Sequence, residues 1–192
     1  MARHKDYNRD DVLDKAVDVF WQKGYKACSI ADLVKVTGLN TASMYKEFGD
    51  KEGLFVEALA HYRRRILAPR LDALMRDPTL EGVENFLRSV IKGASSRQYQ
   101  GCLMMNHLSQ KHAIGQRAAQ KLSDFCVTVE GLIETALQNA QSSGDIPQDK
   151  DPALLASFIT CTVHGLVLYG RHPHSKPAIT KIYDVIAQAL RD

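Results

Sequence analysis

The chain has 192 residues, of which 45% are hydrophobic and 24% are charged. This composition is typical of a globular protein and excludes general disorder, and the length allows a sizeable core without disulfide bonds. Four cysteines, at positions 28, 102, 126 and 161, stand far apart without a CxxC pair. Their spacing argues against a zinc finger and against a secreted disulfide scaffold, and the first residues hold no apolar signal stretch. We therefore expect the protein in the cytosol.

The net charge of +3 is unevenly distributed along the chain. Residues 1–70 hold 13 Lys/Arg and 10 Asp/Glu, whereas residues 71–192 hold 12 of each. The whole positive excess lies in the first third, which indicates, weakly, an anionic partner there.

Apolar residues recur with helical periodicity through the whole chain. The first stripe runs from Val12 to Trp21 behind a capping Asn8, and its helix is expected to close at Gly24. Later stripes occupy residues 54–66, 83–91, 122–140 and 179–190, and proline marks helix starts at residues 78, 152 and 177. We find no alternating run long enough for a sheet. The sequence therefore predicts an all-α fold.

Two short helices joined by a tight turn are predicted between Ser29 and Phe48. Ser29 and Asp32 have the spacing of a capping box, and Gly38 suits the left-handed position of a turn. Asn40 is expected to cap the second helix, leaving Met44 and Phe48 to pack inward. This is the helix-turn-helix pattern, whose second helix lies in the DNA major groove.

The residues around this hairpin resemble the TetR family of transcriptional regulators. The signature of that family ends in residues that here are Tyr45, Phe48, Lys51, Glu52 and Leu54, and its upstream part matches Phe20, Gly24, Ser29, Ile30, Ala31 and Gly38. The resemblance covers about residues 9–60. It implies a three-helix DNA-binding domain at 1–50 and a helical effector-binding and dimerisation domain at 51–192. The implied function is a ligand-responsive repressor that binds a palindromic operator as a dimer and uses no cofactor, metal or catalytic residue.

The resemblance also implies roles for individual side chains. Tyr45, Lys51, Ser29 and Thr41 would contact phosphates, and Tyr45 could instead place its ring on a thymine methyl. Thr41, Ala42, Ser43 and Lys46 are expected to contact base edges. Glu47 either accepts a hydrogen bond from cytosine or faces away from the DNA. The basic run formed by Arg63, Arg64, Arg65 and Arg70 is expected to be a solvated helix face.

Residues 153–170 form an uncharged run of eighteen residues, long enough to raise the question of a membrane span. Its hydroxyl and imidazole groups, and the absence of similar segments, argue against a span. We expect a helix covered on both sides, which pairs with the stripe in 177–190 to form a two-fold, four-helix dimer interface.

Six residues of the second domain are candidate effector contacts, namely Cys102, Met104, His107, Phe125, Cys161 and His164. Gly-Cys at 101–102 resembles a subgroup of the family, some of whose members respond to electrophiles or oxidants. A helix N-terminus at Cys102 would lower the pKa of its thiol, but we favour the interpretation that Cys102 is a small buried residue. The spacing of Cys161 and His164 also suits a metal, but a hydrogen-bonded histidine is commoner.

Two other classes of protein compete with a regulator. A thiol-dependent all-α enzyme would use Cys102 with His107, or Cys161 with His164, but no third orienting group stands at a recognisable spacing. A purely structural helical dimer leaves Tyr45 and Lys51 unexplained.

Overall fold

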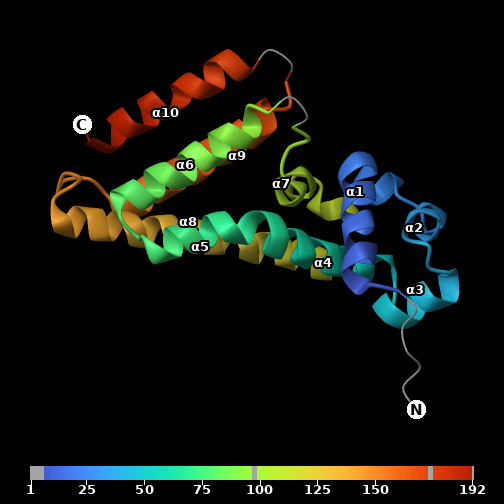
Figure 1. Ribbon diagram of the computed structural model, residues 1–192. Helices are drawn as coiled ribbons and strands as arrows, with labels where there is room; N and C mark the ends of the chain where they lie inside the picture. Colours follow the sequence, from blue (N-terminus) through green and yellow to red (C-terminus); the bar gives the residue numbers. More distant parts are fainter. Residues whose placement is uncertain (1–6, 97–98, 173–174, 192) are drawn as a thin grey trace.

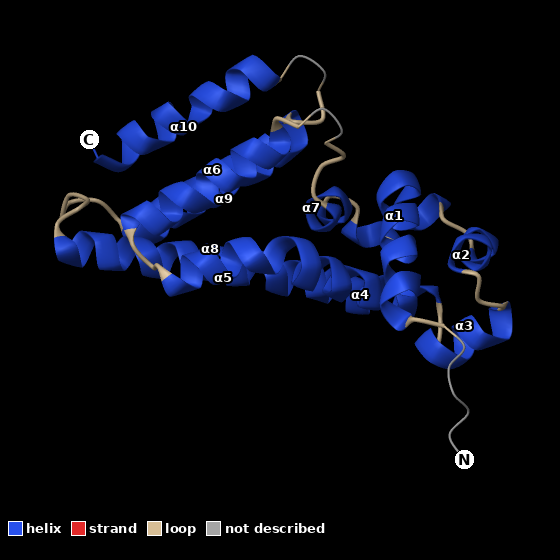
Figure 2. Ribbon diagram, viewed as in Figure 1, coloured by secondary structure: helices blue, strands red, loops and turns tan. Residues whose placement is uncertain are grey.

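The computed structural model describes residues 7–96, 99–172 and 175–191, and every regular element in these ranges is a helix (Figures 1 and 2). The all-α prediction is confirmed. In chain order the elements are α1 (Arg9–Ala27), α2 (Ile30–Thr37), α3 (Thr41–Phe48), α4 (Lys51–Tyr62), the π-helical η1 (Arg63–Leu67), α5 (Ala68–Arg76), α6 (Leu80–Ala94), α7 (Leu103–Leu108), the 3-10 turn η2 (Lys111–Ala113), α8 (Gln116–Ser143), α9 (Pro152–Tyr169) and α10 (Lys176–Arg191).

Helices α1, α2 and α3 form a small body at one end of the molecule, which we call the head (Figure 1). Its core holds Leu13, Phe20, Leu33 and Met44, all fully or almost fully buried. Helix α4 packs along α1 and adds Phe55 to this core. The head is therefore joined directly to the longer helices, and the domain division at residue 50 stays a prediction.

Helix α1 contains a kink where the sequence predicts an end. Gly24 has a φ of 76° and a ψ of 163°, after which the chain turns helical again as far as Ala27. A positive φ is readily adopted only by glycine, so residue type explains the place of the kink. The predicted cap is confirmed, since Asn8 Oδ1 accepts the amide of Asp10 at 2.9 Å.

The helix predicted by the apolar stripe at 54–66 is interrupted after Tyr62 by the π-helical turn η1. Pro69 stands at the start of α5, has no N–H to donate and crowds the carbonyl four residues back. A widened turn ahead of it accommodates both constraints.

The long helix α8 runs beside α4 and α5, and α9 packs against α8 and α6 (Figure 1). Helix α10 packs on α6, at the far edge from α8 (Figure 1). Its apolar stripe is buried in its own subunit, because Ile179, Ile186 and Leu190 are almost fully covered. Other positions of α10 are uncovered, with Val185 65% exposed, so this helix keeps a side that can meet a second chain as predicted.

Candidate nucleic-acid interface and ligand cavity

The turn between α2 and α3 is held by side chains that the sequence marks out. Ser29 and Asp32 form the predicted capping box, with Ser29 Oγ accepting the Asp32 amide at 3.1 Å and Asp32 Oδ2 accepting the Ser29 amide at 2.9 Å. Gly38 is left-handed with a φ of 78°, and Asn40 Oδ1 accepts the amide of Ser43 at 2.8 Å. These contacts fix the angle at which α3 leaves α2, as a helix-turn-helix requires.

Helix α3 has one buried face and one free face. Met44 and Phe48 point into the head, as predicted, while Thr41, Ala42 and Lys46 are exposed and Tyr45 is 46% exposed. The side chains of Thr41, Tyr45 and Lys46 have no hydrogen-bond partner in the part of the chain that the structure describes. Their donors therefore remain available to an external ligand. Ser43 is half-buried between the two faces.

The hydroxyl of Ser29 is already used in the capping box, which competes with its predicted phosphate contact. Its hydroxyl donates to Asp32 Oδ2 at 2.8 Å, and Lys23 Nζ donates to Asp32 Oδ1 at 2.6 Å. The Lys23 ammonium and the Ser29 donors together lower the pKa of Asp32 strongly. Ser29 is exposed at the start of α2, but a phosphate would have to compete with a carboxylate for its proton.

Lys51 stands at the first position of α4 and its ammonium lies 4.4 Å from the centre of the Tyr25 ring. A cation over an aromatic face is held there by the ring quadrupole. Lys51 is half-buried and forms no ion pair within the described ranges. This places a positioned, uncompensated cation beside the head.

Glu47 faces away from the free face of α3, which is one of the two predicted alternatives. Arg9 Nε donates to Glu47 Oε1 at 3.1 Å, and the same guanidinium reaches Glu57 at 2.8 Å. Arg9 thereby joins α1, α3 and α4, and Glu47 belongs to that structural network.

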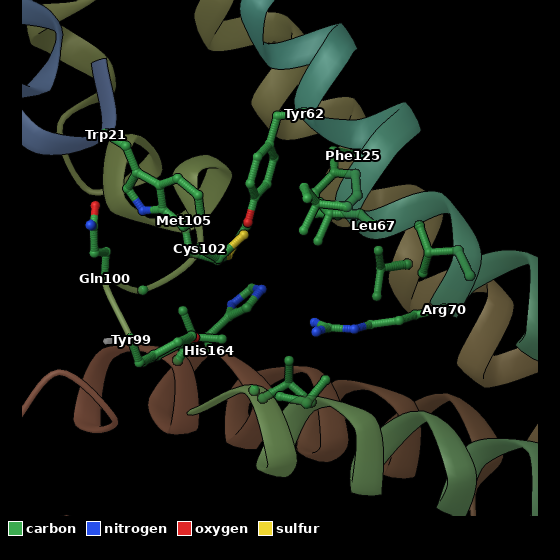
Figure 3. A pocket seen from close by; sticks show the side chains of 18 of the residues that line it. Trp21, Tyr62, Leu67, Arg70, Tyr99, Gln100, Cys102, Met105, Phe125 and His164 are labelled. Atoms are coloured by element: carbon green, nitrogen blue, oxygen red, sulfur yellow. The ribbon is translucent and has the colours of Figure 1, made fainter. Parts of the chain in front are cut away.

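A cavity of about 350 Å³ lies between the head and the longer helices. It is lined from α1 by Asp18 and Trp21, and from the other sides by 20 further residues of α4, η1, α5, α6, the segment 99–105, α8 and α9. This volume lies in the usual range for small-molecule sites. Figure 3 shows Trp21, Cys102, Tyr62, Arg70 and His164 around its interior.

Three of the six predicted effector contacts line this cavity, namely Cys102, Phe125 and His164. Met104, His107 and Cys161 do not. Met105 lines the cavity instead of Met104, because adjacent residues of α7 point about 100° apart and Met104 is turned into the core. Cys161 is exposed on the outer side of α9. Sequence spacing could not supply the rotation of either helix.

His107 has a structural role that its sequence position does not reveal. Its Nε2 accepts the amide N–H of Tyr25 at 3.1 Å, and its Nδ1 lies 2.9 Å from the carbonyl of Leu103. This pair of contacts requires the neutral tautomer that carries its proton on Nδ1. Burial lowers the pKa of His107, which favours the same neutral form. Both nitrogens are used, so His107 is not available as a base for Cys102.

The environment of Cys102 disfavours an activated thiol, which is the less favoured of the two interpretations. Cys102 is buried at the start of α7, a helix of six residues, and this burial raises the pKa of the thiol. The hydroxyl of Tyr62 lies next to the sulfur of Cys102 (Figure 3). A protonated, covered thiol behaves as a small packing residue, because the thiolate is the reactive species. The loss of hydration on burial raises the pKa of the thiol more than the N-terminus of this short helix lowers it.

Two acidic residues at the start of α4, Asp50 and Glu52, join this helix to α8. Glu52 Oε1 accepts the amide of Ala118 at 3.1 Å, and Arg117 donates to both oxygens of Asp50 at 2.7 and 2.8 Å. The N-cap of α8 is Gly115, which has no side chain to offer. Glu52 therefore caps α8 from another helix, a contact 66 residues apart in sequence.

The outer side of α9 carries a continuous exposed row. Leu154 and Leu168 are each 68% exposed and Phe158 is 42% exposed, with Cys161 and Gly165 between them. Val127 on the neighbouring α8 is 72% exposed. The window Pro152–Tyr169 has the length and mean hydropathy, 1.6, of a membrane span, and 33% of it is buried.

Comparisons with known proteins agree along the chain. A family model described as bacterial regulatory proteins of the tetR family matches residues 12–58. A second model, described as the C-terminal domain of tetracyclin repressor-like proteins, matches residues 79–186.

Individual relatives extend over almost the full chain. The HTH-type transcriptional repressor ComR of Escherichia coli K12 is 31% identical over 99% of this chain and 90% of that protein. The repressor BdcR of the same organism is 32% identical over 99% of this chain and 92% of its own length. A solved structure of the TetR family transcriptional regulator CifR with a 26-bp double-strand operator DNA has a TM-score of 0.84 and 29% identity, covering 97% of this chain and 99% of that chain.

Proposed function

Because the chain belongs to the TetR family of bacterial regulatory proteins, we propose that it represses transcription from a two-fold symmetric operator until a small molecule enters its cavity. It is a helix-turn-helix DNA-binding regulator. The observation that supports the operator-reading role most directly is the free face of α3, on which Thr41, Ala42, Tyr45 and Lys46 are exposed. We place this activity in the cytosol, where the DNA of a bacterium lies.

The free face of α3 suits the chemistry of the major groove. The short side chains of Thr41 and Ala42 allow a close approach to base edges, and their methyl groups match the thymine methyl. Lys46 suits the acceptors of guanine, while Tyr45 and Lys51 suit phosphate oxygens. Ser43 lies beside them for a further base contact. In this proposal Ser29 contributes mainly by capping α2.

A dimer would form through the exposed row of α9 and the uncovered side of α10, the two segments that the sequence predicts. Leu154, Phe158 and Leu168 stand on one side of α9, and an uncovered apolar row of this kind marks an interaction surface. A two-fold axis beside this row would pair α9 and α10 with their copies in a four-helix interface. The two α3 helices would then meet half-sites about one helical turn apart.

A ligand in the cavity can change the position of the head, because the cavity walls come both from the head and from the longer helices. Asp18 and Trp21 come from α1 of the head, whereas Arg70 and His164 come from α5 and α9. A ligand that contacts both sides better in one arrangement than in the other shifts the angle of the head. The shift in DNA affinity cannot exceed that difference in binding free energy.

We propose no catalytic role for the cysteines. His107 is occupied by Tyr25 and Leu103, and Cys161 is exposed while its predicted partner His164 lines the cavity. The relatives described above are regulators by name.

Selection of bound sequences from a random DNA pool tests the proposal. The wild-type protein should enrich one two-fold symmetric sequence. Replacing Thr41, Tyr45 and Lys46 together with alanine should abolish the enrichment while leaving the fold intact. Lys92→Ala, at an exposed lysine on α6 outside the head, is the matched control and should select the wild-type sequence. Enrichment of the same sequence by the triple variant would refute the assignment of α3.

A further inference from the structure

The cavity contains a cation without a counter-ion. Arg70 reaches into it from α5, is half-buried, and turns its guanidinium toward His164 (Figure 3). No hydrogen bond or ion pair joins Arg70 to any residue that the structure describes. Gly93 of α6 leaves room for it, because a Cβ there would lie 3.2 Å from the guanidinium. A guanidinium offers five donors, and covered donors normally have acceptors.

A second residue of the cavity wall also has a donor without an acceptor. The indole Nε1 of Trp21 is buried and has no hydrogen-bond partner among the described residues. Trp21 lines the cavity from α1, on the side away from Arg70 (Figure 3). An indole nitrogen can only donate. The wall therefore holds a charged donor, Arg70, that is turned into the cavity, and a neutral donor, Trp21, that is covered.

The other polar groups of the cavity interior supply no negative charge to pair with Arg70. The Tyr62 hydroxyl is engaged with Cys102, and burial lowers the pKa of His164, which keeps its imidazole uncharged at neutral pH. Among the described lining residues, Asp18 is the one carboxylate, and it is exposed to solvent at the rim. The interior is thus electropositive, with apolar walls such as Phe86, Phe125 and Val163.

We propose that the cavity binds a small organic anion with an apolar body, whose carboxylate pairs with Arg70. A carboxylate matches the guanidinium fork with two parallel hydrogen bonds. The apolar body fills the aromatic and aliphatic walls of a cavity of about 350 Å³. This inference rests on the effector role proposed above, and it adds the chemical class of the effector.

Matched acids and amides separate charge from shape in the test. The probes are 3-phenylpropionate, 4-phenylbutyrate and 6-phenylhexanoate, each beside its neutral primary amide. The chain has one tryptophan, Trp21, so its fluorescence reports occupancy of the cavity directly. We expect at least one acid to bind about tenfold tighter than its amide, as a charge-assisted bond implies. Equal affinities in every pair, or no binding by any acid, would overturn the proposal.

Variants assign the preference to Arg70. In Arg70→Gln the acid-to-amide ratio should fall close to one while amide affinity is retained, and Arg70→Lys should keep part of the preference. Arg63→Gln, at an exposed arginine of η1 outside the cavity, should behave like wild type. A preference that survives Arg70→Gln would place the anion elsewhere. Retained amide binding excludes misfolding as the cause.

Operator binding measured in parallel separates this inference from the effector role. If acids bind preferentially in the fluorescence titration but leave DNA affinity unchanged, the ligand class stands and the effector role fails. If acids and amides bind equally and both release DNA, the effector role stands and the ligand class is overturned.

Discussion

At the scale of single residues, the contact between His107 and Tyr25 joins the head to α7 across 82 residues of sequence. Tyr25 directly follows the kink at Gly24, and its amide is directed to the imidazole rather than left to solvent. The ring of His107 also packs 4.8 Å from that of Phe55. The folded state therefore requires a neutral histidine at this position, which makes stability depend on pH.

A pH titration of stability tests this dependence. Since the folded pKa of His107 lies below its usual 6.5, the unfolded chain binds a proton first as pH falls. The contribution of His107 is fully present above pH 6.5 and declines below it until the folded pKa is reached, by up to about 1.4 kcal/mol per pH unit. In His107→Gln the free energy of unfolding should decline less between pH 7.5 and 5. His112→Gln, at an exposed histidine, should keep the wild-type slope, and identical slopes in all three proteins would contradict this account.

Lys51 and Lys46 are predicted to contact different parts of the DNA, a phosphate and a base edge respectively. Lys51→Ala should weaken binding about equally for all DNA sequences and reduce the slope of log affinity against log salt by about one unit. Lys46→Ala should cost about 1–3 kcal/mol at one base pair and relax the preference there. Salt titrations on operator and on mutated operators measure both effects. An unchanged salt slope in Lys51→Ala would remove its phosphate contact.

At the scale of elements, local signals predicted much of the structure. The caps at Asn8, Ser29 and Asn40 and the left-handed Gly38 are all present, because each depends on residues within three positions of one another. The π-helical turn before Pro69 is equally local in cause, although the helical stripe concealed it. Such features depend on backbone chemistry that is written in adjacent residues.

The walls of the cavity were less predictable than the head. Whether Met104 or Met105 faces the cavity depends on the rotation of α7, which its packing against other helices sets. The sequence predicted Arg70 on a solvated helix face, but its guanidinium lies beside Gly93 of α6 and is turned toward His164 of α9. Cys102 was expected at a helix N-terminus, and the depth of its burial decides its pKa instead. These properties follow from contacts between distant segments, which a single sequence does not encode visibly.

The cap that Glu52 provides for α8 leads to a prediction for the link between α4 and α8. A Cβ on Gly115 would lie 2.0 Å from the carboxyl carbon of Glu52, although the backbone there, with a φ of −69°, suits alanine. Gly115→Ala should therefore destabilise wild type by about 1 kcal/mol or more, a typical cost of losing a cap. In the Glu52→Ala background the same change should cost close to nothing.

Urea unfolding of the four proteins in this cycle, at one fixed protein concentration, measures the coupling between Gly115 and Glu52. Equal costs of Gly115→Ala in the two backgrounds would show that the carboxylate does not occupy the α8 terminus.

At the scale of the whole molecule, the exposed row of α9 predicts how an added charge changes the dimer. Phe158→Glu places a carboxylate in the proposed interface, where a second copy of the same charge faces it across the two-fold axis. We expect a shift from dimer to monomer in analytical ultracentrifugation and a loss of operator affinity. Lys92→Glu, at an exposed lysine of α6 outside the interface, is the control and should leave a dimer. A dimer that survives Phe158→Glu would contradict this interface.

The two-fold arrangement of the heads is tested most directly by changing the spacing of the operator. Five base pairs inserted at the centre of the selected operator turn the second half-site by about half a helical turn, out of reach of a rigid dimer. The account predicts that affinity falls to that of a single half-site, while each half-site is still contacted by the free face of α3. Unchanged affinity for the lengthened operator would contradict it.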